Sequence, residues 1–160
     1  MKYIGAFTVI LASILISREY TRYIKRRAEQ CEEFLSFIAY MRIQISCFLR
    51  PVKEMAEGFY ANELCRIGFL KALDDGQSLY EAYKTAEKAL LLSSREREVL
   101  EALFSSLGEC YLDDGIRIID SAYAEMEKLC RVIRDDRPKK TRLAATLSVT
   151  ASIGFLILVL

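Results

Sequence analysis

Two stretches without charge lie near the ends of this chain of 160 residues, and they constrain its fold more than any other feature. The first covers residues 3–17 and the second covers residues 143–160. Eighteen residues of α-helix measure about 27 Å, close to the roughly 30 Å hydrocarbon core of a bilayer. We therefore expect the second stretch to span a membrane. The first is shorter, and we expect Tyr3, Arg18 and Tyr20 to extend it at the interfaces.

The charges between these stretches follow an order along the chain. Residues 18–27 hold five basic residues and one acidic residue, and residues 131–142 hold six basic and two acidic residues. Residues 28–130 hold eleven basic and nineteen acidic residues. Basic residues beside a span favour the cytoplasmic side, so we expect residues 18–142 in the cytoplasm and both termini outside. The flanking basic residues are Arg18, Arg22, Lys25, Arg26, Arg27, Lys139, Lys140 and Arg142.

A cleaved signal peptide is the alternative interpretation of residues 3–17. Such a peptide carries its positive charge before the apolar run and small residues at a cleavage site after it. Here the basic cluster follows the apolar run, and no small-x-small site does. We therefore expect three parts: an N-terminal membrane anchor at 1–19, a cytoplasmic helical-bundle domain at 20–138 and a C-terminal membrane anchor at 139–160. The chain would be a two-pass protein of the cell membrane.

Apolar residues with helical spacing recur in two sets, which we call the first and second seams. Within each set the steps alternate between three and four residues, which is the spacing of a helix packed against a partner helix. Both seams continue toward an expected membrane anchor, so we expect two long helices that pair in antiparallel orientation. The first seam is Cys31, Phe34, Ile38, Met41, Ile45 and Phe48, and the second is Ile116, Ile119, Tyr123, Met126, Cys130 and Ile133.

Shorter helices are expected between the two long ones. Pro51 ends the first long helix, near residue 49, and starts a short helix at about 52–59. Asn62 is a candidate N-cap for a helix over 62–73, which the turn at 74–76, "DDG", would close. The two aspartates of that turn could suggest a divalent ion, but turn chemistry explains them better.

Two capping boxes predict further helix starts. Ser78 with Glu81 has the spacing for a helix that runs to about residue 92, and Ser93 with Glu96 has it for the next. The buried face of the latter is expected to consist of Val99, Leu100, Leu103, Phe104 and Leu107.

The last helix is expected to start at a second "DDG", residues 113–115, and to stop at a proline. Asp114 can cap its N-terminus, and Pro138 is expected to break it before the second membrane stretch. The predicted fold is therefore all-α, a helical bundle of about six helices between an N-terminal and a C-terminal transmembrane helix.

The sequence offers little catalytic chemistry. It contains no histidine, which removes the commonest general base and metal ligand, and its seven glycines form no phosphate-binding loop. The basic clusters flank membrane stretches, so anionic lipid explains them better than nucleic acid. We expect no enzyme activity, cofactor or metal. The five cysteines are expected to be reduced thiols that pack in the core, namely Cys31, Cys47, Cys65, Cys110 and Cys130.

The acidic middle of the chain offers a surface for a basic partner. In the antiparallel arrangement, Glu109, Asp113 and Asp114 lie at the end farthest from the membrane, where a cytoplasmic partner would arrive. The alternative is that Asp114 only caps a helix and that the other two carboxylates are solvated.

Three short segments, in their order along the chain, resemble the stage III sporulation protein AB family. They are "RPVKEMAEGF" at 50–59, "SLYEAY" at 78–83 and "EREVLEALFSSLGE" at 96–109. Within the last, Leu100, Leu107 and Gly108, followed by Asp113, match the family's pattern of a leucine-glycine pair that leads to an acidic turn. The resemblance covers essentially the whole chain.

The resemblance implies a helical domain similar to those of the inner-membrane platform proteins of type II secretion and type IV pilus machines. It further implies a platform in the channel complex between mother cell and forespore, beside a secretion-type ATPase and other membrane subunits. The alternative is a membrane-tethered regulatory or structural helical protein unrelated to secretion. Binding to a hexameric ATPase distinguishes the two.

Overall fold

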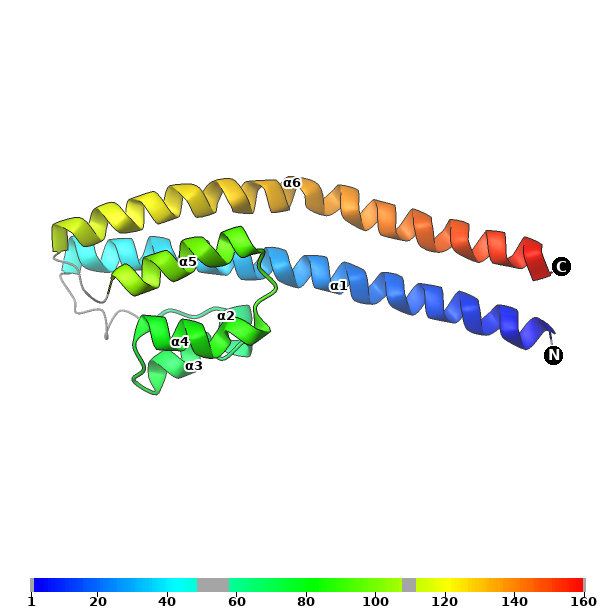
Figure 1. Cartoon of the computed structure of the whole chain (residues 1–160), viewed down its shortest axis with the longest axis horizontal. Helices are drawn as coiled ribbons and strands as arrows, with labels where there is room; N and C mark the ends of the chain where they lie inside the picture. The colour runs from blue at the N-terminus through cyan, green and yellow to red at the C-terminus, as the bar shows by residue number, and fades with distance from the viewer. Residues whose placement is uncertain (1, 49–57, 108–111, 160) are drawn as a thin grey trace.

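The structure is a computed structural model whose backbone is described for residues 2–48, 58–107 and 112–159. Within these ranges, side chains are not described for residues 2–10, 47–48, 112–113, 148, 151–153 and 155–159. The described part is all-helical, as the seams and capping boxes predict. Two long helices lie side by side and antiparallel, both termini lie at one end, and the short helices pack beside the other half of the pair (Figure 1).

The first long helix, α1, covers Lys2–Ile43 and continues as one turn of π-helix over Gln44–Phe48. No proline interrupts the sequence before residue 51, so nothing removes a backbone donor along this length. The helix therefore continues to Phe48, and its predicted end near residue 49 lies outside the described residues. The expected helix at 52–59 falls almost entirely outside them.

The second long helix, α6, covers Leu112–Val159 and differs from the prediction at both of its expected boundaries. Asp114 lies in its first turn rather than at its N-cap, and Gly115 is already helical, so the second "DDG" is not a turn. Pro138 lies inside the helix and does not end it. A proline costs one backbone hydrogen bond in a helix, and the packing and length of the rest of α6 can outweigh that loss.

The short helices are α2 (Asn62–Arg66), α3 (Phe69–Asp74), α4 (Leu79–Ala86) and α5 (Ser94–Ser106). The single helix expected over 62–73 is split because Gly68 has a φ of 84°, which ends α2. Ala61 rather than Asn62 occupies the N-cap of α2. The helix that follows Ser78 ends at Ala86 and passes into a short 3₁₀ turn, so it does not reach residue 92.

The predicted turn and capping boxes are present. Gly76 closes α3 with a φ of 85°, which explains the two aspartates before it as turn residues. At the start of α4, the backbone N–H of Ser78 donates to Oε2 of Glu81 at 2.9 Å, and the Ser78 hydroxyl accepts from the Glu81 N–H at 3.3 Å. Ser93 and Glu96 make the equivalent pair at α5.

Both seams face the core. Every member of the first seam whose side chain is described is at most 4% exposed. In the second seam, Ile119, Met126 and Cys130 are buried, and the others pack partly buried against the core. The predicted antiparallel pairing of the two long helices is confirmed, and α1 with α6 forms the most extensive contact between helices. The predicted face of α5, from Val99 to Leu107, is buried as well.

Aromatic rings fill the space between α1 and the short helices. Phe34 and Phe37 of α1 contact Phe69 of α3, with ring centroids 5.4 and 5.3 Å apart, and Phe104 of α5 lies 5.6 Å from Phe69. All four residues are at most 1% exposed. Such edge-on and tilted contacts add to the burial of the rings themselves. The aromatic cluster thereby attaches α3 and α5 to α1.

A disulfide between Cys31 and Cys130 corrects the expectation that all cysteines are reduced thiols. Their Cα atoms lie 5.8 Å apart, and the two residues are 0% and 5% exposed. They belong to the first and second seams, so the bond joins α1 to α6 within the core. Cys65 is a free, exposed thiol and not a core residue. Cys47 and Cys110 lie outside the described side chains.

A search of the described residues finds no helix with a segment apolar enough to cross a membrane. The transmembrane anchors expected at 1–19 and 139–160 are therefore not confirmed and stay predictions.

Candidate functional site

The long helices extend beyond the rest of the bundle as a pair, which we call the stalk (Figure 1). We define it as residues 2–23 of α1 and 131–159 of α6, because Ile24 and Cys130 are the outermost buried core residues on the two helices. Its described aliphatic side chains are exposed to an unusual degree. The most exposed are Leu11 50%, Ile14 48%, Leu15 53% and Ile16 69% on α1, with Val132 62%, Leu143 62%, Leu147 59% and Val149 58% on α6, whereas Ile133 is half-buried against the core.

An exposed apolar surface of this kind marks a site of contact with a membrane or another protein. The two helices also enclose a pocket of about 340 Å³ along the stalk. Small residues, Ser13 and Ser17 on α1 and Ala144 on α6, line it beside larger aliphatic residues. Tyr20 closes it on the side of the bundle. The apolar part of the stalk therefore ends near Tyr20 on α1, next to the basic residues.

The predicted flanking basic residues fall into two groups. Arg18, Arg22 and Lys25 are exposed on α1 next to the apolar part of the stalk. On α6, the second group of basic residues is exposed next to the apolar part of the stalk. Within it, Lys140 pairs with Asp136 at 3.4 Å. This second set is Lys139, Lys140 and Arg142.

Arg26 and Arg27 are different, because they hold the short helices against α1. Arg27 Nη2 lies 3.0 Å from Oε1 of Glu96, a carboxylate whose side chain is only 3% exposed at the start of α5. Arg26 Nε lies 3.8 Å from Oε2 of Glu63 on α2. A nearly buried carboxylate requires such a partner, since an unpaired buried charge is strongly disfavoured.

Gln30 completes this polar hub, and nothing in the sequence predicts it. It is 0% exposed, its Oε1 accepts from the Leu91 N–H at 2.8 Å, and its Nε2 donates to Glu63 at 3.4 Å. Glu33, one turn further along α1, accepts from the Leu64 N–H at 2.9 Å. These bonds satisfy backbone groups at the start of α2 and in the segment before α5. In the sequence, the only indication of these hydrogen bonds is that polar residues occur beside the apolar residues of the first seam.

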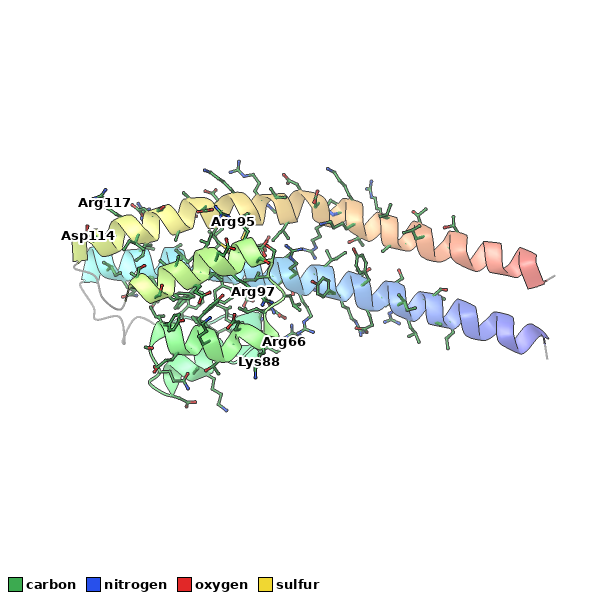
Figure 2. The ribbon with its side chains drawn as sticks, in the orientation of Figure 1. Arg66, Lys88, Arg95, Arg97, Asp114 and Arg117 are labelled. Carbon is green, nitrogen blue, oxygen red and sulfur yellow. A yellow bond between two sulfur atoms is a disulfide. The ribbon has the colours of Figure 1, made fainter. Side chains whose placement is uncertain are left out.

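The expected partner-facing residues lie at the opposite end. Asp114 is exposed in the first turn of α6, with Arg117 beside it (Figure 2). Glu109 lies outside the described residues, and so does the side chain of Asp113. Nearby, Asp120 of α6 is held by Arg42 of α1, with Nε and Oδ1 2.6 Å apart. Asp114 is therefore the one of the three predicted partner-facing residues whose side chain is described.

Two titratable groups sit where α4 meets α5. Burial raises the pKa of the Tyr83 hydroxyl to about 12, with the carboxylates of Glu87 and Glu101 adding to the effect. A hydrogen bond to Glu101 raises the pKa of Lys84, whose Nζ lies 2.8 Å from that carboxylate. Both groups bond α5, Tyr83 through the Arg97 carbonyl and Lys84 through Glu101, so they join α4 to α5. Within the described residues, no cluster of Cys, Asp or Glu could hold a metal ion.

Comparison with protein families gives one match. A model of the stage III sporulation protein AB family matches residues 2–160. The chain belongs to the stage III sporulation protein AB family. The resemblance of its short segments is thus confirmed over its whole length. The searches of curated proteins and of solved structures found no match.

The segments that resemble this sporulation family carry its fold. "SLYEAY" provides the capping box of α4 and places Leu79, Ala82 and Tyr83 in the core. "EREVLEALFSSLGE" begins with the hub carboxylate Glu96 and continues with the buried face of α5. In this chain of the sporulation family, the two segments therefore supply core residues of α4 and α5.

Proposed function

We propose that this protein is a non-enzymatic membrane platform of a sporulation channel complex between mother cell and forespore. In this proposal the stalk enters the cell membrane as a two-pass hairpin, and the bundle lies in the cytoplasm of the mother cell. Disulfides are rare in that compartment, and the burial of Cys31 and Cys130 would shield their bond from cytoplasmic reductants. The observation that carries it is the stalk itself. Two helices leave the same end of the bundle side by side, and most of their described aliphatic side chains are about half exposed or more.

The charges of the stalk support the same orientation. The exposed basic residues of both helices lie between the bundle and the charge-free stretches at 3–17 and 143–160. Such residues prefer the cytoplasmic face of a membrane. Inserted in this way, the charge-free stretches would meet lipid, and the pocket between them would face other membrane subunits of the complex.

The far end of the bundle is the surface that the proposal gives to a secretion-type ATPase. Because α1 and α6 are antiparallel, the start of α6 lies at the end away from the termini (Figure 1). An ATPase ring is too large to fit against the lipid, so it would approach this end. Asp114 is exposed there, and rim charges of this kind mainly set the association rate and its dependence on salt.

A binding measurement tests the proposal. The full-length protein, solubilised in detergent, is immobilised and the purified ATPase of the same channel is passed over it at low and high salt. Reversing Glu109 to Lys and replacing Asp113 and Asp114 by Asn should weaken binding several-fold at low salt, and thermal unfolding of the same variant shows that the bundle stays folded. The control reverses Glu32 and Glu98, which are exposed on α1 and α5, and should bind as the parent does.

The outcomes separate the two functional hypotheses. If the surface variant and the control variant both bind as tightly as the parent, the ATPase contacts another surface of the bundle. No binding by the parent protein would favour the tethered regulatory or structural protein that needs no ATPase.

A further inference from the structure

Two basic residues from the acidic middle of the sequence lie at the stalk-facing end of the bundle. Arg66 is the last residue of α2, and Lys88 lies in the 3₁₀ turn after α4. Figure 2 labels both at the end of the bundle from which α1 continues toward the N-terminus. Their position in the sequence gives no hint of this, because they are separated from the flanking basic clusters by long acidic segments.

Arg66 shares a groove with basic residues of α1. Arg22, Lys25, Arg26 and Arg66 line an open groove of about 700 Å³. We call these four residues, together with Lys88, the basic collar. The collar draws on α1, α2 and the turn after α4, so the fold alone assembles it.

The carboxylates in the groove do not neutralise the positive charge of the collar. Glu19, Glu29 and Glu63 line the groove too, and each pairs with a cation there. The basic side chains remain between 43% and 62% exposed. The pairs with Glu19 and Glu29 are exposed on both sides and therefore weak. Glu63 is nearly buried and is held more firmly by Arg26 and Arg66. A guanidinium has five N–H donors, so one carboxylate leaves most of them free for another acceptor. Lys88 is exposed and makes no ion pair with the described part of the chain.

The helical rise between the charge-free stretch and Arg26, compared with the thickness of the headgroup layer, puts the collar next to a membrane surface. Nine residues separate Ser17, the last residue of the charge-free stretch, from Arg26, and nine helical residues rise about 14 Å. The headgroup layer on one side of a bilayer is about 5–7 Å thick. The remaining distance is about one Debye length at physiological salt. The extended side chains of Arg and Lys shorten it further.

We propose that the basic collar binds the phosphate headgroups of anionic lipids and so fixes the bundle against the membrane. This inference rests on the insertion of the stalk that the proposed function assumes. Each Lys or Arg near an anionic surface raises membrane affinity about fivefold. Arg66 and Lys88 lie to the side of the stalk, so their binding would stop the bundle from swinging about α1 and keep its far end directed into the cytoplasm.

The exposed thiol of Cys65, next to Arg66, provides a probe at the right place. The full chain with Cys47→Ser and Cys110→Ser keeps its disulfide and leaves Cys65 for a fluorophore. It is inserted into nanodiscs of phosphatidylcholine, with or without one third phosphatidylglycerol, each with the same fraction of headgroup-quencher lipid. Quenching should be at least twofold stronger in the anionic discs, and 0.5 M salt should remove the difference.

Single substitutions of matched charge decide whether the collar is responsible. Lys88→Gln and Arg66→Gln should each remove a large part of the additional quenching. Arg117→Gln, at the opposite end of the bundle (Figure 2), should leave it unchanged. Equal quenching in neutral and anionic discs, or equal effects of Lys88→Gln and Arg117→Gln, would overturn the inference alone. A chain that does not enter the discs at all would overturn the proposed function with it.

Discussion

At the scale of single residues, Gln30 of α1 holds α2 and the segment before α5 through its side-chain amide. Gln30 is fully buried among apolar neighbours, yet it bonds the Leu91 N–H and Glu63. The seams predict which apolar residues face the core, because that depends only on helical spacing. A polar partner 61 residues away depends on the tertiary fold. The capping serine–glutamate pairs could be predicted, since both members lie within one turn.

Gln30→Leu should destabilise the bundle by about 1–3 kcal/mol, because it leaves the buried Leu91 N–H and part of Glu63 without a partner. Denaturant unfolding of the full chain in detergent measures this loss. Glu32→Leu changes an exposed residue on the same helix and serves as the control. Equal midpoints for Gln30→Leu and the parent would show that water replaces the missing amide.

Tyr83 should make the bundle sensitive to high pH. Its side chain is fully buried, its hydroxyl donates to the Arg97 carbonyl at 3.2 Å, and burial raises its pKa to about 12. In the unfolded chain a tyrosine titrates near pH 10. The folded state therefore keeps the full contribution of neutral Tyr83 below pH 10 and loses it as the pH rises toward 12.

Tyr83→Phe tests this dependence. The variant should be slightly less stable at pH 8, by about 1 kcal/mol for the lost hydrogen bond, and should lose less stability than the parent between pH 10 and 12. Melting temperatures over that range give the comparison. The exposed Tyr80, replaced by Phe, should change neither value, and parallel pH curves for Tyr83→Phe and the parent would contradict the assignment.

At the scale of the elements, the two seams predicted the antiparallel helix pair, and the disulfide now gives that pairing a register. Cys31 and Cys130 are members of opposite seams, one near the stalk end of each bundle segment. An antiparallel pair brings such positions together, so the bond could have been inferred from the seams. The continuity of α6 through Pro138 could not have been inferred from the sequence. Helix propensity predicts only that a proline removes a backbone hydrogen bond and destabilises the helix.

Reduction of the disulfide should weaken this helix pair. The bond joins residues separated by 99 positions. Chain entropy gives about 4.7 kcal/mol of stabilisation for a loop of that length, and disulfides typically contribute about 2–4 kcal/mol. Both cysteines are buried, so the reductant should be added before refolding. The denaturation midpoint of the parent should fall under reducing conditions, while Cys31→Ala/Cys130→Ala should give the same midpoint with and without reductant. If the denaturation midpoint of the parent is the same with and without reductant, Cys31 and Cys130 are packed thiols and form no disulfide.

Ile119→Asp tests the packing of the seams themselves. Ile119 is 0% exposed on α6, and a carboxylate there would be buried without a partner. The variant should unfold or lose several kcal/mol, as followed by circular dichroism during heating. Glu32→Lys, exposed on α1, is the suitable control, whereas Glu33 is not, because it accepts from the Leu64 N–H. Equal melting of Ile119→Asp and the parent would refute the pairing.

At the scale of the whole molecule, charge order along the chain and the fold support the same arrangement. The sequence predicts two apolar ends with basic residues beside them, and the fold brings both ends out of one end of the bundle. The Arg66 and Lys88 part of the collar could not be predicted, because it depends on how α2 and α4 pack on α1.

The central claim is that the stalk crosses the membrane with the bundle on its cytoplasmic side. Reporter fusions in living cells test it directly, one inserted at the exposed Gly76 turn and one placed after Leu160. The account predicts that a reporter active only in the cytoplasm works at Gly76 and that one active only outside works after Leu160. An external reporter active at Gly76, or a chain recovered free of membranes, would contradict it.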